Sequence, residues 1–332
     1  MFNGGNTNSS RILIVRLGAM GDIIHALPAA ASLKHSFPGS ALTWVVEPRW
    51  APLLADNPFV DRLVLLRRDG PRGLRQTWRE LRSCRYDFAV DFQGLLKSAL
   101  VASSARPERL FGFHQSQVRE RAAALFYSNK TISRSVHVVD QNLDLAAAAG
   151  AANAVRKFPL PPGRPESPLP EGDFVLASPL AGWRAKQWPI ENYQELARLL
   201  RRELGVPLVL DGPPSAQPLL RQVEDAFPHS SGLPGLIYAT RRAAAVVGVD
   251  SGPLHVAAAL AKPGVALYGP TDPGRNGPYG DSLQVLRSAD AVTTYKRSSV
   301  IDPSMTRITA DQVFSALRSV LGQRFRSAGC RS

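Results

Sequence analysis

The stretch ILIVRLGAMGDIIHALPAAASLKHSFPGSALTWVV (residues 12–46) decides the fold. It opens with the apolar run ILIVRL (12–17), passes through a helical stretch at 26–35 and ends in a second apolar run, LTWVV (42–46). Two β-rich runs around a helical stretch are typical of a βαβ unit, whose parallel strands are buried on both faces. We therefore predict a parallel sheet covered by helices.

The same alternation continues in both directions from this stretch. Further short strands are expected at 63–66, 88–92 and 110–113, which completes a doubly wound N-terminal domain over residues 11–157. The Asn/Gly/Ser-rich residues 1–10 are expected to be a flexible tail. Residues 158–173 hold six prolines in 16 positions, which excludes a helix or a central strand, so we predict a linker there.

After the linker the alternation starts again and predicts a second doubly wound domain over residues 174–322. We expect its last helix to pack back on the first domain. Open α/β sheets bind ligands at the carboxyl ends of their strands, so we expect a binding cleft between the two domains. The predicted strands are 174–177, 207–210, 244–249 and 264–268, and the predicted helices are 192–204, 215–227 and 253–261.

Composition narrows the class of protein. The chain has 332 residues, of which 44% are hydrophobic and 20% are charged, which excludes a disordered or fibrous protein. Its net charge of +13 predicts an anionic partner: nucleic acid, an acidic membrane surface or a phosphorylated substrate. Cys84 and Cys330 belong to no metal-binding spacing, and no run approaches the ~20 apolar residues of a spanning helix. We expect a cytoplasmic protein without a metal site.

The first βα junction, LGAMGDIIH (17–25), holds a candidate catalytic residue. Its glycines at 18 and 21 allow close approach of the backbone, and Asp22 is expected near the start of the next helix. The junction lacks the GxGxxG fingerprint of dinucleotide-binding proteins. Two interpretations stay open: Asp22 carries out chemistry in the cleft, or it only caps the helix.

A second junction, VGVDSGPLH (247–255), predicts an anion site. Ser251 or Gly252 can cap the following helix and Pro253 suits its first position, which leaves backbone N–H groups exposed. Such a helix start binds phosphate without a metal ion. The alternative is an ordinary capped helix.

Two further loops follow predicted strands of the second domain. Lys186 lies in WRAKQWP (183–189), where a lysine can reach phosphate; the alternative is a solvated loop lysine. Thr271 lies in YGPTDPG (268–274), where it can contact a sugar or a phosphate; turn formation alone also explains this sequence.

Arginines recur at helical spacing between residues 67 and 85. Arg72, Arg75, Arg79 and Arg82 share one helical face beside Leu74, Trp78 and Leu81, which suits an anionic membrane surface. The alternative is a solvated helix with Trp78 in the core. No nucleic-acid recognition motif is present in the sequence.

Taken together, these segments resemble the lipopolysaccharide heptosyltransferases (glycosyltransferase family 9), most of all heptosyltransferase I. The resemblance spans nearly the whole chain, in one order of spaced motifs. It is carried by RLGAMGDIIHALPA (16–29), TWVVE (43–47), YDFAVDFQGLLKSAL (86–100), RE and ALFY within 119–127, KQWP (186–189), VVGVDSGPLHVAAAL (246–260) and YGPTDPGRNGPYG (268–280).

The resemblance implies a GT-B fold, with two facing Rossmann-like domains, and an inverting transfer of heptose from ADP-heptose to Kdo (3-deoxy-D-manno-octulosonic acid) of the inner core. It implies no cofactor, no metal and no nucleic-acid partner. The expected setting is a monomer at the cytoplasmic face of the inner membrane, acting on a Kdo-lipid A acceptor. The implied roles are catalytic base for Asp22, donor binding for Lys186, Asp250, Ser251, Gly252, Pro253, His255 and Thr271, and acceptor binding for Gly21, His25, Lys97 and Arg119.

The chain also departs from the pattern of heptosyltransferase I. Two threonines that precede the lysine in the family are Ala181 and Gly182 here, and loop 211–217 lacks the acidic residue that the family often uses near the ribose. The alternatives are transfer of another sugar, a GT-B nucleotide-sugar epimerase, and a non-catalytic sugar-nucleotide binding module.

Overall fold

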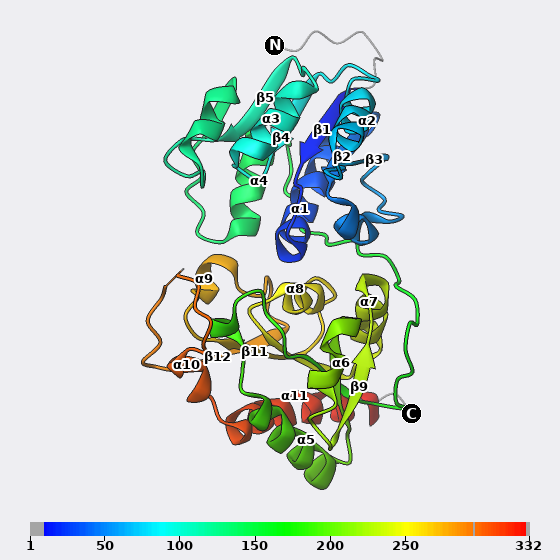
Figure 1. Cartoon of the computed structure of the whole chain (residues 1–332), viewed down its shortest axis with the longest axis vertical. Coiled ribbons are helices and arrows are strands. Elements are labelled where there is room, and N and C mark those ends of the chain that lie inside the picture. The colour runs from blue at the N-terminus through cyan, green and yellow to red at the C-terminus, as the bar shows by residue number, and fades with distance from the viewer. Residues whose placement is uncertain (1–9, 295, 330–332) are drawn as a thin grey trace. The chain divides into compact units, whose positions relative to one another are not determined.

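The chain folds into two compact α/β units, Met1–Pro159 and Leu160–Ser332. The computed structural model describes residues 10–294 and 296–329, the last seven of them by their backbone alone. Residues 1–9 of the predicted N-terminal tail lie outside the described residues. Figure 1 shows a sheet flanked by helices in each unit.

The first unit is built on a six-stranded parallel sheet in the order β3-β2-β1-β4-β5-β6. β1 lies at its centre, paired with β2 and β4, and four of its five residues, Ile12, Leu13, Ile14 and Val15, are fully buried. Burial of each such side chain stabilises the fold by roughly 1.5–3 kcal/mol. The strands are β1 (Arg11–Val15), β2 (Ala41–Val46), β3 (Arg62–Leu65), β4 (Phe88–Asp91), β5 (Arg109–Phe113) and β6 (Asn129–Thr131).

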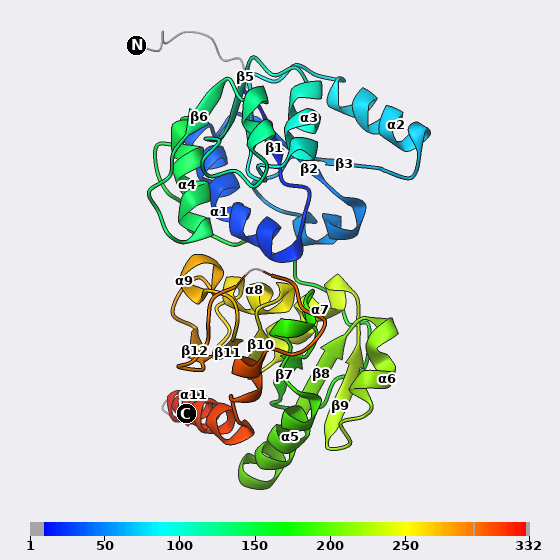
Figure 2. The same cartoon turned by 60° about the vertical axis from the view of Figure 1, so that its left-hand side comes forward.

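Helices cover both faces of this sheet (Figure 2). α1 (Met20–Ser36) and α4 (Val138–Ala148) pack side by side on one face. α2 (Pro71–Leu81), α3 (Leu96–Ser104) and the 3-10 helix η2 (Arg121–Phe126) cover the other, in one core with Leu13 and Val15. The short η1 (Pro48–Leu54) follows β2.

The second unit repeats the plan with the strand order β12-β11-β10-β7-β8-β9. Its strands are β7 (Val175–Ser178), β8 (Leu208–Gly212), β9 (Ala226–Ser230), β10 (Ala245–Val249), β11 (Gly264–Tyr268) and β12 (Leu283–Arg287). Its helices are η3 (Arg184–Lys186), α5 (Ile190–Leu204), η4 (Pro214–Ala216), α6 (Gln217–Leu220), α7 (Leu233–Arg242), α8 (Gly252–Ala259), α9 (Pro273–Asn276), α10 (Pro303–Thr306) and α11 (Ala310–Gly329).

The last helix packs within the second unit, and its expected return to the first domain stays a prediction. α11 packs on α5 and β11, and Val313, Leu317 and Leu321 are buried in the core of the second unit. These side chains recur every four residues and form one apolar stripe, which the nearest sheet face buries.

The prediction of one helix over residues 215–227 is wrong. The helix stops at Leu220, and Ala226–Ser230 forms the edge strand β9. Pro228, which lies opposite Leu210, is tolerated there because an edge strand need not donate every ladder hydrogen bond. β6, α7 and β12, which no apolar run announced, complete the sheets and their cover.

The proline-rich segment 158–173 leaves little free chain between the units. The Pro159 carbonyl accepts a hydrogen bond from Asn57 in the first unit (3.0 Å), and the Leu160 carbonyl accepts one from Arg241 in the second (2.8 Å). Further along, Glu166 accepts the Gly232 N–H (2.7 Å). Because proline removes N–H donors but keeps carbonyl acceptors, these contacts rely on donors from elsewhere, while the Arg164 N–H and the Ser167 hydroxyl donate from the segment itself.

Candidate active site

Asp22 lies in the first turn of α1, at the carboxyl end of β1. One carboxylate oxygen accepts the Ala19 N–H (3.1 Å), as in a capping box, and the other forms an ion pair with Arg16 (2.8 Å). Arg16 is 8% exposed, whereas Asp22 is 43% exposed. The helix-capping interpretation therefore holds, and the same carboxylate remains open to a ligand.

The segment that directly follows β4 holds the first βα junction and Arg16 in place. A terminal nitrogen of Arg16 donates to the Phe92 carbonyl, and the Leu17 N–H donates to the Gln93 side chain (2.8 Å). A buried guanidinium that is held at two points gives Asp22 one preferred position. The sequence prediction named Asp22 and missed Arg16.

The two glycines of the junction and His25 are packed tightly. A side chain at Gly18 would come within 2.7 Å of the Trp50 indole nitrogen, so this position requires glycine. Gly21 is buried. His25 is 3% exposed, and its ring lies edge-on to His137 at the start of α4, 5.7 Å away. His25 thus takes part in the packing of α1 on α4.

Three cations converge on Glu47, at the carboxyl end of β2. Lys97 (3.0 Å), Arg68 (3.2 Å) and Arg49 (3.2 Å) all pair with its carboxylate. Burial alone would raise the pKa of Glu47, but the Lys97 hydrogen bond and the three positive charges outweigh it and lower the pKa. One carboxylate cannot neutralise three cations, so this cluster retains positive charge that can bind an anionic ligand.

Arg119, the other predicted acceptor-side cation, lies near the start of α3. It is exposed, and the carboxylate of its neighbour Glu120 accepts the Leu96 N–H (2.6 Å). This bond ties the segment before η2 to the helix that carries Lys97. Arg49 and Arg68 complete the cationic surface and were missed, because charged residues in loops resemble ordinary solvated residues in a sequence.

A fully buried aspartate supports these loops from below. Asp91 accepts hydrogen bonds from Ser98 of α3 (2.7 Å) and from the Tyr127 hydroxyl (2.8 Å). Burial raises the pKa of Asp91, and the hydrogen bonds offset only part of that rise. Asp91 joins β4, α3 and the end of η2 in one network.

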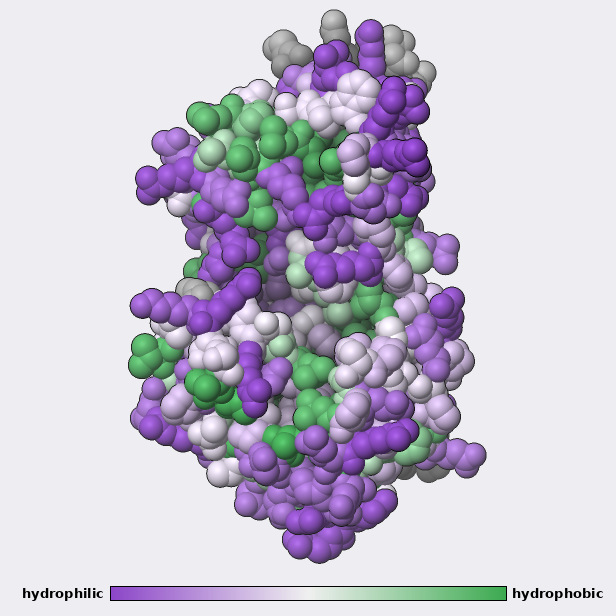
Figure 3. Space-filling model, viewed as in Figure 1, coloured by the Kyte–Doolittle hydropathy of each residue, from purple (hydrophilic) through white to green (hydrophobic). Residues whose placement is uncertain are grey.

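The outer face of α2 is both basic and apolar. The helix packs through Gly73, Thr77 and Leu81, so Leu74 and Trp78 are 51% and 45% exposed. The interpretation that placed Trp78 in the core is therefore wrong. Leu96 and Leu100 of α3 and Leu125 of η2 are also exposed on this side of the sheet. Figure 3 shows hydrophobic surface among hydrophilic residues on the first unit.

In the second unit, Asp250 is the centre of a cluster at the carboxyl ends of three neighbouring strands. It follows β10 and pairs with Lys186, from the segment after β7 (2.6 Å). It accepts the Thr271 hydroxyl, from the segment after β11 (2.8 Å), and lies 3.9 Å from His255. The structure thus brings together four residues that the sequence placed in the donor site.

The start of α8 adds hydrogen-bond donors to this cluster. Ser251 is the N-cap residue, and Gly252 and Pro253 open the helix. The Ser251 side chain makes no capping bond, and its buried hydroxyl oxygen has no hydrogen-bond partner among the described residues. Buried hydroxyls are normally satisfied, so this group is poised for a ligand.

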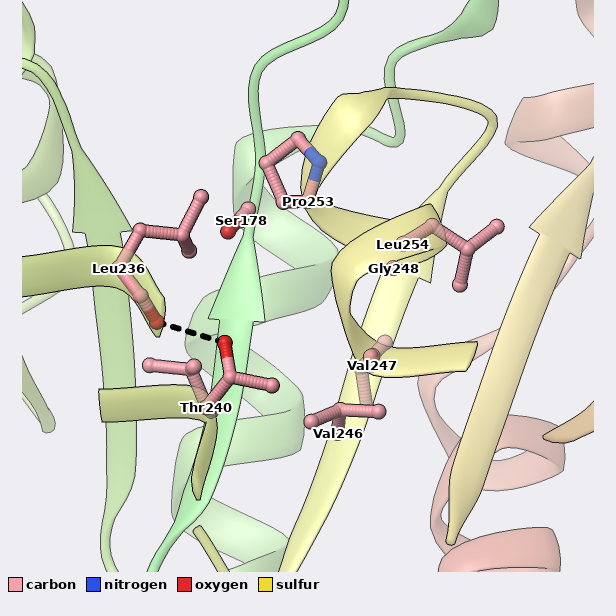
Figure 4. A pocket seen from close by; sticks show the side chains of 10 residues that line it. Ser178, Leu236, Thr240, Val246, Val247, Gly248, Pro253 and Leu254 are labelled. Carbon is pink, nitrogen blue, oxygen red and sulfur yellow. Dashed lines mark hydrogen bonds between the residues drawn. The ribbon is translucent and has the colours of Figure 1, made fainter. Parts of the chain in front are cut away.

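A small hollow lies under the start of α8 (Figure 4). Leu236 and Thr240 of α7, Ser178 of β7 and Pro253 and Leu254 of α8 line it, and the Thr240 hydroxyl bonds back to the Leu236 carbonyl (2.7 Å). Its lining is nearly all apolar, so it is a gap in the packing of α7 and α8 rather than a site for a charged ligand.

Two features are absent from the part of the chain that the structure describes. Over residues 10–294 and 296–329, no three His, Cys, Asp or Glu residues gather closely enough to hold a metal ion. No helix in the same part of the chain combines the length and the apolar character that crossing a membrane requires.

Comparison with known proteins shows which family this chain resembles. A model of glycosyltransferase family 9 (heptosyltransferase) matches residues 74–303. Lipopolysaccharide heptosyltransferase 1 of Escherichia coli K12 is 31% identical over 312 residues, covering 84% of this chain and 93% of that protein. Lipopolysaccharide heptosyltransferase 1 of Pseudomonas aeruginosa PAO1 is 33% identical over 304 residues, covering 84% of each protein.

Solved structures agree. E. coli heptosyltransferase WaaC with ADP superposes with a TM-score of 0.77 at 25% identity, covering 93% of this chain and 99% of that one. E. coli ADP-heptose lps heptosyltransferase II gives a TM-score of 0.76 at 24% identity over 95% and 99% of the two chains. The prediction of two doubly wound sheets in a GT-B fold is confirmed.

Proposed function

Since the chain belongs to glycosyltransferase family 9, the heptosyltransferases, we propose that it transfers heptose from ADP-heptose to the Kdo of a lipid A acceptor. The observation that carries this proposal is the cluster of Lys186, Asp250 and Thr271 beside the start of α8. Its relative WaaC was solved with ADP and with ADP-2-deoxy-2-fluoro heptose, so a nucleotide-sugar donor fits this site.

The cluster around Asp250 supplies hydrogen-bond donors to the diphosphate that leaves in the reaction. Negative charge grows on the ADP oxygen as its bond to the sugar breaks. Lys186, the Ser251 hydroxyl and the backbone N–H groups that open α8 would stabilise that charge. We propose that Gly252, Pro253 and His255 shape this site and that the reaction needs no metal ion, because these groups do the work of a cation.

The acceptor side supplies a base. In the proposed step, an acceptor hydroxyl attacks the anomeric carbon of the heptose from the face opposite the diphosphate, so the configuration inverts. The bond from that carbon to the ADP oxygen breaks, and Asp22 takes the hydroxyl proton. Arg16 is a positioning residue that keeps the carboxylate oriented for this transfer.

The acceptor must present negative charge to this side of the molecule. Kdo carries a carboxylate and lipid A carries phosphates, and the Glu47 cluster offers Lys97, Arg68 and Arg49 to bind them. Arg119 extends the same surface from the segment before η2. Gly21 and His25 are proposed to shape the junction around Asp22.

The anionic lipid surface is the second proposed partner. Exposed Leu74 and Trp78 lie among the arginines of α2, and Arg82 stacks on the Trp78 ring at 4.2 Å. Tryptophan and arginine together suit the boundary between lipid headgroups and acyl chains. We propose that this face holds the protein at the cytoplasmic face of the inner membrane, where the acceptor lies.

The test is a transfer assay with ADP-heptose and Kdo-lipid A, with the product identified by mass. Wild-type protein should add one heptose, and Asp22→Asn should reduce the rate by about a hundredfold or more, because it removes the proton acceptor. ADP affinity, measured by calorimetry, should stay unchanged in that variant.

Asp61→Asn is a matched control. Asp61 is 45% exposed, pairs with Lys34 at 2.7 Å and accepts a backbone N–H, as Asp22 does. It should transfer at the wild-type rate. Full activity in Asp22→Asn would contradict the assignment of Asp22 as the base. Release of heptose from the donor in the absence of an acceptor would point to an epimerase-like enzyme instead.

A further inference from the structure

The loop between β12 and α10, described over residues 288–294 and 296–302, is tied to two of the three segments that carry donor-site residues. The Thr294 N–H donates to the Pro270 carbonyl (2.7 Å), next to Thr271. The Asp302 N–H donates to the Ala185 carbonyl (3.2 Å), next to Lys186. The loop is therefore fixed against the donor group at two points.

Arg297 is carried by this loop toward the same indole ring as Lys186. The Arg297 guanidinium carbon lies 5.5 Å from the centre of the Trp183 ring, and the Lys186 Nζ lies 4.5 Å from it. Cations are attracted to the face of an indole, so Trp183 holds both positive charges in one place. Arg297 is exposed, and it forms no ion pair with any residue that the structure describes.

The charge balance of the site leaves a role for this arginine. Lys186 is already paired with the nearly buried Asp250, so the pair is close to neutral. A diphosphate carries more than one negative charge, and unpaired charge in a partly dry site is costly. Ala181 and Gly182, which precede Trp183, offer no side-chain donor. Arg297 is a cation beside this ring that no carboxylate neutralises among the described residues.

We propose that Arg297 binds the diphosphate of the nucleotide donor together with Lys186, and that Trp183 positions it. The inference rests on the proposed function, because it assigns a further residue to the same donor site. The planar guanidinium can hold phosphate oxygens with two parallel hydrogen bonds, which a lysine cannot do.

The experiment is calorimetric titration of ADP and of inorganic pyrophosphate into the full-length wild type and its variants. Arg297→Ala should weaken both ligands about tenfold or more, as expected for loss of a charged hydrogen bond, and Arg297→Lys should restore part of that loss. Trp183→Leu should weaken both ligands about threefold, and Trp183→Phe should restore binding, because an aromatic face is what positions the arginine.

Arg318→Ala is the matched control. Arg318 is an exposed arginine of α11 that also stacks on a ring, Phe314, at 5.9 Å. It should bind both ligands as the wild type does. Affinities of Arg297→Ala within about twofold of the wild type would overturn the inference.

Failure of the inference can be told apart from failure of the proposed function. Wild-type protein that binds pyrophosphate through Arg297 but binds no ADP would contradict the proposed donor and support the phosphate role. Wild-type protein that binds neither ligand would contradict both.

Discussion

Asp250 in the second unit and Glu47 in the first each gather partner side chains at the end of a strand, and of these two only Asp250 was predictable from the sequence. Asp250 lies in a strand-to-helix junction, and the Ser, Gly and Pro that follow it are typical of a helix start that can bind phosphate. Glu47 follows a strand in the same way, but its partners Arg68 and Lys97 come from 21 and 50 residues away. No local sequence pattern predicts these ion pairs, because they form only when β2, β3 and α3 come together in the fold.

Arg297 was unpredictable for a related reason. It lies in a loop without a regular pattern, 114 residues from Trp183, and long-range contacts such as the backbone hydrogen bonds at Thr294 and Asp302 bring the two together. Asp22 and Lys186, by contrast, follow strands whose apolar runs are plain in the sequence.

The pKa of Glu47 gives a prediction at the scale of one residue. Its pKa is lowered in the folded protein, so the ionised carboxylate stabilises the fold above its ordinary pKa of 4.5 and this stabilisation is lost as the pH falls through the lowered value. Glu47→Gln should cost about 1 kcal/mol of unfolding free energy at neutral pH, because its cationic partners are partly exposed. Urea unfolding measures this difference.

The cost should shrink as the pH falls below 4.5, and it should vanish below the lowered pKa, where the carboxylate of folded wild-type Glu47 also becomes neutral. Glu203→Gln, which loses an exposed pair with Arg202, should leave stability unchanged at every pH. A cost of Glu47→Gln that does not vary with pH would contradict the charge argument.

At the scale of elements, the strands were easier to predict than the helices. Every predicted strand is present to within two residues at each end, because runs such as 12–15 and 264–268 are continuous and largely apolar. α1 begins six residues before the predicted start at Ala26, since the Gly21 backbone accepts helical geometry and Asp22 caps the first turn. The helix predicted at 215–227 ends early, because proline-containing β9 has an edge to pair with.

The start of α8 gives a prediction at the element scale. Because the Ser251 hydroxyl is buried without a partner among the residues that the structure describes, Ser251→Ala should leave the melting temperature unchanged or slightly raised. It should also weaken ADP by about fivefold, since it removes one donor to phosphate.

Thr271→Val supplies the contrast. That hydroxyl is bonded to Asp250, so its loss should lower stability as well as ADP affinity. Thermal melting and calorimetry separate the two cases. A clear loss of stability in Ser251→Ala would show that the hydroxyl has a structural partner after all.

At the scale of the whole molecule, the net charge of +13 raises the question of where the positive charge acts. The α2 face combines arginines with exposed Leu74 and Trp78, whereas α5 carries Arg198, Arg201 and Arg202 beside acidic partners. Replacing Arg72, Arg75 and Arg79 by Gln should weaken binding to vesicles with anionic lipid by about 3 kcal/mol, at roughly 1 kcal/mol for each charge.

The control removes the same amount of charge elsewhere. Gln at Arg198, Arg201 and Arg202 should leave vesicle sedimentation nearly unchanged, because those arginines are paired with acids. Trp78→Ser should weaken binding without changing its dependence on salt. Equal losses in the two triple variants would mean that net charge, and not this face, attracts the membrane.

The segment that crosses from one unit to the other, at Pro159 and Leu160, has little conformational freedom. The Pro159 carbonyl is held by Asn57 and the Leu160 carbonyl by Arg241, so the chain leaves one unit and joins the next within a single residue. Proline rings at 159, 161 and 162 fix three φ angles there. The conformational freedom of the chain at this crossing is therefore confined to the few backbone torsions that the proline rings leave free.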